Sequence, residues 1–278
     1  MRLHNAAIFF DRETVLDGYT GATLFKAQVK NFNDASSTGA TLRRRVLSTS
    51  PASVMPARGC VRLGDLHWIA GVSLADSFQG RDIRHTYNLR IGSSLFDILT
   101  PGRACSGVVS VPPAYGYEEF FKDNQDNLTG SAYDTFWNIF FSPSEPIVVG
   151  SFLRVGSRML RVRQTYVNAE DLRVAESDEL DADWSQTVVF TDLSTYNPVT
   201  DTYTGTTISV QGVQLDSFKL YKWRVESEAQ KKPGDRTVIV PLTITPVVGA
   251  TFTMVGRSWR VISAQPELDA WALHSRLV

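Results

Sequence analysis

The chain of 278 residues has a mass of 30.9 kDa, which suits two or three domains of ordinary size. Its 43% hydrophobic and 21% charged residues are enough to bury a core, and they exclude a mainly disordered chain. Its 28 basic and 29 acidic side chains leave a net charge of −1, which argues against a protein that mainly binds nucleic-acid phosphates.

The short apolar runs and the two isolated cysteines argue against a membrane-spanning, secreted or zinc-binding protein. No run approaches the roughly 18 consecutive apolar residues that a membrane-spanning helix needs. The first residues lead into a short strand-like run and lack the pattern of a signal peptide. Cys60 and Cys105 form neither a disulfide framework nor a zinc-site spacing. We therefore expect a soluble, multidomain protein made in a reducing cytoplasm.

Short β-strands are the main elements that the sequence predicts. Threonine, valine, serine and aromatic residues dominate segments that glycine- or proline-marked turns separate about every ten residues, as in Thr237–Thr245. This spacing predicts an all-β fold of two or three tandem small β-sandwich or β-barrel modules with few short helices.

The first distinctive segment along the chain is a basic cluster, Arg43-Arg44-Arg45. It lies in a strand-like context, where alternation places the arginines on both faces of the strand. That division weakens a nucleic-acid-binding patch and favours an edge strand or a subunit contact.

The next segment, Pro56–Ile69, predicts a tight hairpin. A two-residue loop at Gly64-Asp65 pairs Leu63 with Leu66 and Val61 with Trp68, so that all four side chains share one face. His67 then lies on the outward face of the hairpin.

Two segments are candidates for short helices. Ala114–Asn127, with aromatic residues at Tyr117, Phe120 and Phe121, fits a short amphipathic helix. Ala169–Asp181 fits either a helix or an acidic loop. Neither segment is long enough for a helical bundle.

A second hairpin is predicted over 146–162. With a four-residue loop, Val155 lies opposite Leu160 and Leu153 opposite Val162. Arg154 and Arg161 then fall on the solvent-facing side.

A third hairpin is predicted over 246–262. With a Gly256-Arg257 loop, Met254 lies opposite Trp259 and Phe252 opposite Val261 on one face. The alternation is self-consistent and places Trp259 in the core.

The three hairpins share an order of features that indicates internal repetition. In each, a proline ends one strand, a glycine opens the next, and a tight hairpin follows; these glycines, Gly59, Gly150 and Gly249, are 91 and 99 residues apart. Chance similarity among hairpins of a β-rich chain is the alternative. We expect three β modules at residues 1–92, 93–185 and 186–278.

The sequence contains no catalytic, cofactor-binding or metal-ligating constellation. There is neither a nucleophile elbow nor a phosphate-binding glycine loop, and neither cysteine has a recognisable base partner. Asp123–Asn127 lacks the glycine and glutamate of a calcium loop and fits a polar loop. The four histidines are dispersed and show no ligand spacing: His4, His67, His85 and His274. We expect a protein that is not an enzyme and needs no cofactor or metal.

An acidic run and the tryptophans bear on binding surfaces. A solvated face or loop is the ordinary interpretation of the acidic run, and a surface that meets a basic partner or repels nucleic acid is the alternative. The run consists of Glu176, Asp178, Glu179, Asp181 and Asp183. Trp68 and Trp259 are expected to face the core, whereas the sequence leaves open the positions of Trp137, Trp184, Trp223 and Trp271.

The C-terminal segments resemble a known family. Val238–Pro241, Pro246–Gly249, Thr251–Glu267 and Ala270–Leu273 together resemble the C-terminal part of the head–tail joining proteins of tailed bacteriophages, which include head-closure (stopper) and neck proteins. The motifs are a turn, a hairpin with an aromatic residue after its loop, and a final strand. This chain departs from the family because it carries up to three such units, whereas a typical joining protein has one.

The resemblance implies a virion structural protein of the head–tail junction, assembled in the cytoplasm of a host bacterium. Such a protein forms a ring of about six or twelve copies that connects the portal to the tail and maintains or seals the DNA channel. Its partners are copies of itself and the portal, adaptor and tail proteins. DNA passes nearby without sequence-specific binding, and no membrane is involved.

Other functions stay open at this point. Within structural proteins, the alternatives are a tail-tube, tail-adaptor or capsid-decoration component. A carbohydrate- or receptor-binding β module requires exposed tryptophans, and an enzyme requires carboxylates or a histidine–nucleophile pair that converge in a cleft. Two long polar segments, Asn31–Gly39 and Glu226–Gly234, are expected to order when a partner docks.

Overall fold

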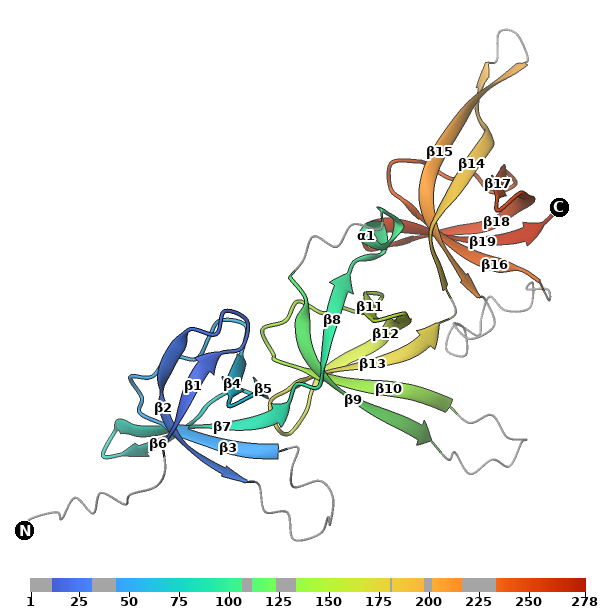
Figure 1. Ribbon diagram of the computed structural model, residues 1–278. Coiled ribbons are helices and arrows are strands. Elements are labelled where there is room, and N and C mark those ends of the chain that lie inside the picture. The colour runs from blue at the N-terminus through green and yellow to red at the C-terminus, as the bar shows by residue number, and fades with distance from the viewer. Residues whose placement is uncertain are drawn as a thin grey trace, which may run out of the picture.

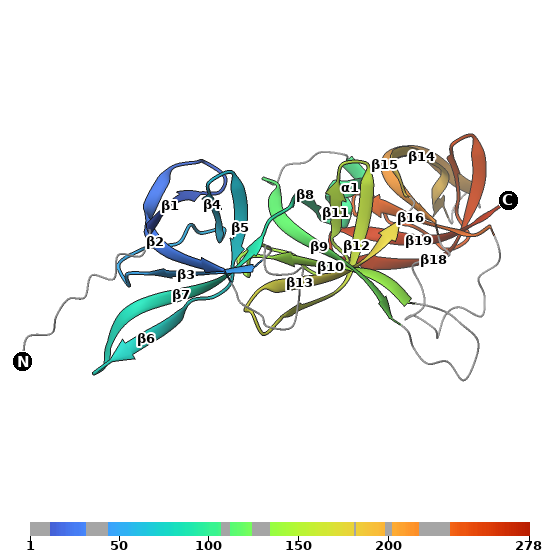
Figure 2. The same cartoon turned by 60° about the horizontal axis from the view of Figure 1, so that its bottom comes forward.

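The computed structural model describes residues 12–31, 44–106, 112–123, 134–180, 182–197, 202–216 and 234–278, which form nineteen strands and one short helix (Figure 1). The predicted all-β fold of tandem modules with few short helices is confirmed. The strands divide into three antiparallel units that lie in a row in both views (Figures 1 and 2). We refer to these units as the first, second and third barrels.

The first barrel closes through a pairing between β3 and β7, and β6 extends the sheet beyond that ring. Its strands are β1 (Arg12–Asp17), β2 (Thr23–Asn31), β3 (Arg44–Thr49), β4 (Cys60–Leu63), β5 (Leu66–Ala70), β6 (Leu74–Phe78) and β7 (Arg81–Ile91). Figure 2 shows the β6–β7 hairpin projecting away from the ring.

The second and third barrels are closed and have six strands each. The second consists of β8 (Ser94–Leu99), β9 (Ala114–Asp123), β10 (Asp134–Phe141), β11 (Phe152–Val155), β12 (Arg158–Val167) and β13 (Arg173–Leu180), with α1 (Pro101–Ser106) after β8. The third consists of β14 (Ala182–Asn197), β15 (Thr202–Asp216), β16 (Arg236–Pro241), β17 (Thr251–Met254), β18 (Arg257–Glu267) and β19 (Ala270–Leu277). β14 begins inside the range 93–185 expected for the second module.

All three barrels have the same strand order. The ring β3-β2-β1-β4-β5-β7 corresponds strand by strand to β10-β9-β8-β11-β12-β13 and to β16-β15-β14-β17-β18-β19. The repeated glycines Gly59, Gly150 and Gly249 occupy equivalent turns with φ of 59°, 89° and 92°, a region that a residue with a Cβ rarely adopts. Residues of different barrels can therefore be matched by their strand register.

Each barrel is centred on large buried side chains. Trp68 is fully buried in the first barrel and Trp259 is 5% exposed in the third, so their predicted core positions are confirmed. In the second barrel Phe96 and Phe141 pack edge to face with ring centroids 5.3 Å apart.

The first hairpin has the predicted register, and the other two do not. Val61 pairs with Trp68 and Leu63 with Leu66, as predicted. In the second hairpin, however, Leu153 pairs with Leu160 across a two-residue loop. A shift of two residues moves every partner yet keeps each side chain on its face, so the alternation could not detect it.

The third hairpin shows the same error. Phe252 pairs with Trp259 and Met254 with Arg257 across a Val255-Gly256 loop, instead of the predicted Gly256-Arg257 loop. Val255 and Gly256 both have positive φ, 50° and 67°, as a two-residue hairpin turn requires.

The prediction of a helix over Ala114–Asn127 is wrong, because β9 occupies Ala114–Asp123 and pairs with β8 and β10. Aromatic residues favour strands as well as an apolar helix face, and a neighbour on each side provides the backbone partners. Asn124–Asn127, including most of the predicted polar loop, lies outside the described residues.

The alternatives of a helix or an acidic loop over Ala169–Asp181 are also wrong, because β13 spans Arg173–Leu180. Asn168 makes the preceding turn: its side-chain oxygen accepts hydrogen bonds from the backbone N–H groups of Glu170 and Leu172, both at 3.0 Å. The strand contains buried residues, such as Val174 and Ala175, as well as the ion-paired Glu176 and Asp178.

The basic cluster is not in an edge strand, which corrects that prediction. Arg44 and Arg45 lie in β3, which pairs with β2 on one side and with β7 on the other. Arg44 pairs with Glu170 of the second barrel at 3.1 Å, and Arg45 lies over the Trp68 ring. Arg43 is outside the described residues.

Candidate functional site

Within the described residues, no group of three or more histidine, cysteine, aspartate or glutamate side chains could hold a metal ion. His67 stacks on Tyr115 with ring centroids 3.9 Å apart, and His274 contacts Asp235 at 2.9 Å. Burial raises the pKa of the Cys60 and Cys105 thiols to about 12, so neither forms a thiolate readily at neutral pH. Cys105 lies in α1.

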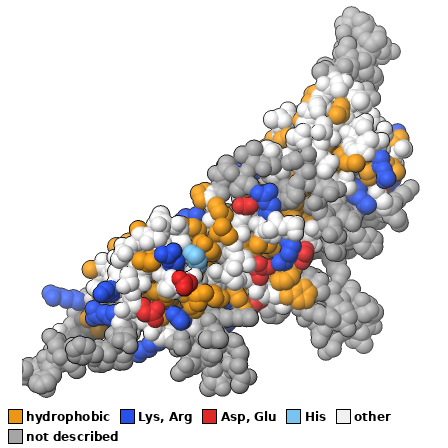
Figure 3. Space-filling view, in the orientation of Figure 1, with side chains coloured by type: hydrophobic (Ala, Val, Ile, Leu, Met, Phe, Trp, Pro, Cys, Tyr) orange, Lys and Arg blue, Asp and Glu red, His pale blue; other side chains and the backbone are white. Residues whose placement is uncertain are grey.

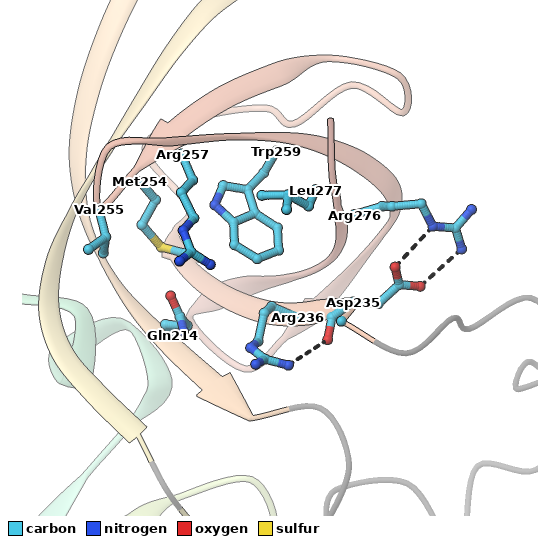
Figure 4. Close-up of a pocket in the computed structure, with 10 residues that line it drawn as sticks. Gln214, Asp235, Arg236, Met254, Val255, Arg257, Trp259, Arg276 and Leu277 are labelled. Atoms are coloured by element: carbon cyan, nitrogen blue, oxygen red, sulfur yellow. Dashed lines mark hydrogen bonds and ion pairs between the residues drawn. The ribbon is translucent and has the colours of Figure 1, made fainter.

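The third barrel has a cavity of about 480 Å³ at one mouth (Figure 4). The ends of β15, β16 and β19 and the β17–β18 hairpin bring its lining residues together. The polar members are Gln214, Asp235, Arg236, Arg257 and Arg276, and the apolar members include Met254, Val255, Trp259 and Leu277.

Asp235 is the acidic residue of this lining and is 1% exposed. Its carboxylate accepts hydrogen bonds from Arg276 at 2.9 and 3.0 Å and contacts His274 at 2.9 Å. The hydrogen bond to Asp235 raises the pKa of Arg276 above its ordinary value. A buried carboxylate with these partners is already satisfied, and it leaves an excess of positive charge at the mouth.

Two donors at the same mouth lack an acceptor. The buried Trp259 indole N–H has no hydrogen-bond partner. Arg257 is exposed, and no described residue forms an ion pair or a hydrogen bond with it. Figure 4 shows the indole nitrogen on the side of the ring that faces Arg257. The mouth can therefore accept an anion more readily than a cation.

The contact between the first and second barrels is a second candidate functional feature, because it fixes how the modules act together. Its apolar part packs Ile69 and Ile91 of the first barrel against the second-barrel residues Tyr117, Phe140, Leu172 and Val174. Only residues 92–93 separate β7 from β8, so the connection allows little relative movement.

A buried arginine lies at the centre of this contact. Arg90 is 3% exposed and pairs with Glu119 and with Glu170 (3.4 Å). Its guanidinium carbon lies 3.7 Å from the centroid of the Phe140 ring. Both carboxylates belong to the second barrel, so the charge of Arg90 is neutralised across the contact.

A second polar group closes the margin of the contact. Arg58 pairs with Glu145 at 3.0 Å and donates to the backbone oxygens of Pro112 and Pro113. The Tyr19 hydroxyl also reaches Glu145, at 3.3 Å. Glu145 itself is 3% exposed.

The second and third barrels join through a larger apolar cluster. Leu99, Ala104, Cys105, Phe152, Met159 and Leu180 of the second barrel pack against Val213, Leu215, Ile239, Ala270 and Ala272 of the third. Arg161 pairs with Glu267, and both side chains are nearly buried. The prediction that Arg161 faces solvent is therefore wrong. The backbone N–H of Gly102 donates to Asp269 at 2.8 Å.

Both contacts use equivalent surfaces. By strand register, Tyr117, Phe140, Leu172 and Val174 of the second barrel correspond to Val213, Ile239, Ala270 and Ala272 of the third. We call this the upstream face of a barrel, since it contacts the preceding one. The opposite, downstream face is the outer side of the β4–β5 hairpin and of its equivalent β11–β12.

The acidic run is largely ion-paired in the second barrel. Arg163 lies between Glu176 (3.4 Å) and Asp178 (3.5 Å), and Glu179 accepts a hydrogen bond from Trp137. Asp181 is outside the described residues. Figure 3 shows basic and acidic side chains interspersed over the first two barrels on the face in view.

The remaining tryptophans give little support to a ligand-binding platform. Trp137 and Trp271 are half-buried, and Arg158 lies over the Trp137 ring at 4.2 Å. The side chain of Trp184 and the whole of Trp223 lie outside the described residues, as do most of the polar segments 31–39 and 226–234. Sequence reasoning missed both inter-barrel contacts, whose signal was only the apolar outward residues of the first two hairpins, such as Ile69, Phe152 and Met159.

Comparisons of the chain with known protein families, proteins and structures found no relative. No family model, no curated protein and no solved structure matches the chain. Among the described residues, no helix is long and apolar enough to cross a membrane.

Proposed function

We propose that this protein is a non-enzymatic virion structural protein of the head–tail interface of a tailed bacteriophage. In this role it forms an oligomeric ring of about six or twelve copies that connects the portal to the tail and maintains the DNA channel. Its partners are other copies of itself and the portal, adaptor and tail proteins.

The stacking of three equivalent barrels carries the proposal. Each contact buries an apolar cluster and an arginine–carboxylate pair, Arg90 with Glu119 and Arg161 with Glu267. A unit that keeps its shape is suited to hold two large particles at a fixed separation, because docking then costs little conformational entropy. The proposed location in the virion rests on the resemblance of the C-terminal strands to head–tail joining proteins.

The β6–β7 hairpin offers a place for contact between copies. β6 pairs with β7 alone among the described strands, so one backbone edge stays open for a strand of a neighbouring molecule. Leu74 and Ile83 in this hairpin are 57% and 60% exposed, which adds apolar surface to that edge.

The charge of the chain is compatible with a channel for DNA. The net charge of −1 and the mixture of basic and acidic side chains on the face of Figure 3 support passage of DNA without tight phosphate binding. A tail-tube, tail-adaptor or capsid-decoration role is the alternative within structural proteins, and the location of the bound protein distinguishes among these roles.

A DNA-retention assay tests the function. Purified protein is mixed with filled, tailless phage heads, nuclease is added, and the DNA that stays protected is measured. We expect protection to rise with protein concentration and to saturate, and an unrelated β protein of similar mass serves as the control. Equal leakage with and without the protein would show that it does not seal the channel.

A further inference from the structure

The second barrel shows what an arginine binds at the mouth of these barrels. Arg158 directly follows the two-residue loop of its hairpin, and Arg257 has the same place in the third barrel. Arg158 pairs with Glu118 at 2.7 Å and with Glu179 at 3.3 Å. Two carboxylates of the same chain therefore satisfy this guanidinium.

The third barrel keeps the arginine and lacks both carboxylates. By strand register, Gln214 stands at the place of Glu118, and Leu277 stands at the place of Glu179. Arg257 consequently has no acidic partner among the described residues, although it borders the same kind of mouth. The substitutions leave a positive charge where the second barrel has a neutral cluster.

A second donor appears where these acceptors are missing. Trp259 occupies the place of Leu160 in the second barrel, is 5% exposed, and has an unpaired indole N–H. Its nitrogen lies on the side of Arg257 in Figure 4. A buried donor without an acceptor is costly, and a carboxylate has lone pairs for both the guanidinium and the indole.

We propose that a partner protein supplies the missing carboxylate, as a glutamate or aspartate side chain that enters this mouth and pairs with Arg257. The cavity of about 480 Å³ holds such a side chain together with an apolar neighbour against Met254, Val255 and Leu277. Three arginines and one acidic residue line the cavity, so its charge complements an acidic segment. The site stands independently of the proposed location in a virion.

A titration followed by nuclear magnetic resonance tests the site. The probe is a blocked peptide with two glutamates, and the comparison ligands are the same peptide with glutamines and inorganic phosphate. We expect the Trp259 indole N–H signal, identified by its absence from Trp259→Phe, to shift and saturate with the glutamate peptide. The glutamine peptide should leave that signal in place, and phosphate should bind more weakly than the glutamate peptide.

Two variants make the titration specific. Arg257→Gln should weaken peptide binding at least about tenfold, because it removes a charge-assisted pair. Arg260→Gln is the matched control, since Arg260 is an exposed arginine of the same strand and does not line the cavity. The double variant Gln214→Glu/Leu277→Glu restores both carboxylates within the chain and should abolish the shift while the other indole signals stay native.

Three results would each overturn the proposal. The first is an equal shift with the glutamine peptide, and the second is unchanged binding by Arg257→Gln. The third is tighter binding of phosphate than of the glutamate peptide. A failure to form rings or to retain DNA would contradict the virion proposal and leave this titration unaffected.

Discussion

At the scale of single residues, Arg90 shows how the first two barrels are held together. Its guanidinium is nearly buried, with a carboxylate on either side and the Phe140 ring beneath it. Removing one partner of such a group leaves the others desolvated and unpaired. The stability of the contact between the first two barrels therefore depends on Arg90 more strongly than it would on one exposed ion pair.

We expect Arg90→Met to lower the free energy of unfolding by roughly 2–3 kcal/mol. This is below the loss for a fully buried pair, because Glu119 and Glu170 are 34% and 24% exposed and water screens them. Urea unfolding monitored by circular dichroism measures the change. Arg84→Met is the control, since Arg84 pairs with Asp76 on the exposed hairpin and should cost less than about 1 kcal/mol. Equal losses in the two variants would contradict the central role of Arg90.

Trp259 tests the core of the third barrel. Truncation to alanine removes a large, 5% exposed side chain, so we expect a loss of about 3–5 kcal/mol in the urea unfolding of this barrel. Val248→Ala in the turn before β17, where the side chain is 64% exposed, should change stability by less than about 0.5 kcal/mol. A negligible loss for Trp259→Ala would place its side chain outside the core.

His67 makes the first contact sensitive to pH. Burial, followed by the charge of Arg62, lowers the pKa of His67 below its ordinary value of 6.5. The folded state then binds this proton less readily than the unfolded state does. The contribution of His67 to stability is fully present above pH 6.5. It falls as the pH drops from 6.5 to the lowered pKa of His67, and it does not change further below that pKa.

The measurement is urea unfolding between pH 7.5 and 5.5. We expect His67→Phe, which keeps a ring to stack on Tyr115, to lose less stability over this range than the natural sequence does. An identical pH slope in both proteins would show that His67 does not contribute.

Alternation in the sequence predicts which side chains face the core, and it predicts little about their partners. The inward positions of Trp68, Phe252 and Trp259 followed from a period of two residues. The pairing of Arg90 with Glu170, eighty residues away, has no such periodic signal. Arg161 looked solvent-facing because a strand pattern cannot distinguish water from an adjacent barrel.

At the scale of elements, β9 and β13 explain why the helix predictions failed. Tyr117 and Val174 serve the inter-barrel contact, whereas Ala114 and Ala175 on the opposite face of the same strands pack in the core of the second barrel. Both faces of the strands are thus occupied, and the alternation of apolar and polar residues is blurred. In the hairpin of the third barrel, whose outward residues Thr251, Ser258 and Arg260 are polar, the alternation was clear.

The turn at Gly71 positions the first barrel against the second. A Cβ added to Gly71 would lie 2.3 Å from the backbone oxygen of Glu170, which cannot move without displacing the turn before β13. We expect Gly71→Ala to open the contact and to expose residues 92–93 to protease. Limited proteolysis measures the rate of cleavage.

Val72→Ala provides the control, since Val72 is the adjacent residue and is 52% exposed. Its cleavage rate should equal that of the natural sequence. Resistance of Gly71→Ala to protease, together with an unchanged melting temperature, would show that the close approach at Glu170 does not fix the contact.

At the scale of the whole molecule, the outer faces of the first and third barrels differ in polarity from the faces that meet between barrels. The upstream face of the first barrel has Gln28, Ser48 and Thr86 at the places of Tyr117, Phe140 and Val174. The downstream face of the third has Thr251, Ser258 and Arg260 at the places of Phe152, Met159 and Arg161. At these equivalent positions the two outer faces are therefore more polar than the faces that meet between the barrels.

The repeated hairpins made an arrangement in three modules predictable. The sequence did not show which faces of the modules pack together. The recurrent glycine and hairpin gave the spacing of the modules, because every barrel needs the same turn. The order of apolar and polar faces along the stack could not be predicted, since it depends on which outward residues meet the next barrel. The two internal contacts and the two polar ends are properties of the assembled molecule.

The most direct test of the proposed role is cryo-electron microscopy of filled, tailless phage heads mixed with the purified protein. We expect ring-shaped density of about six or twelve copies at the portal vertex, with three stacked barrels resolved in each copy. Heads without added protein provide the reference. Absence of density at the portal vertex, or copies scattered over the capsid surface, would contradict a role at the head–tail interface.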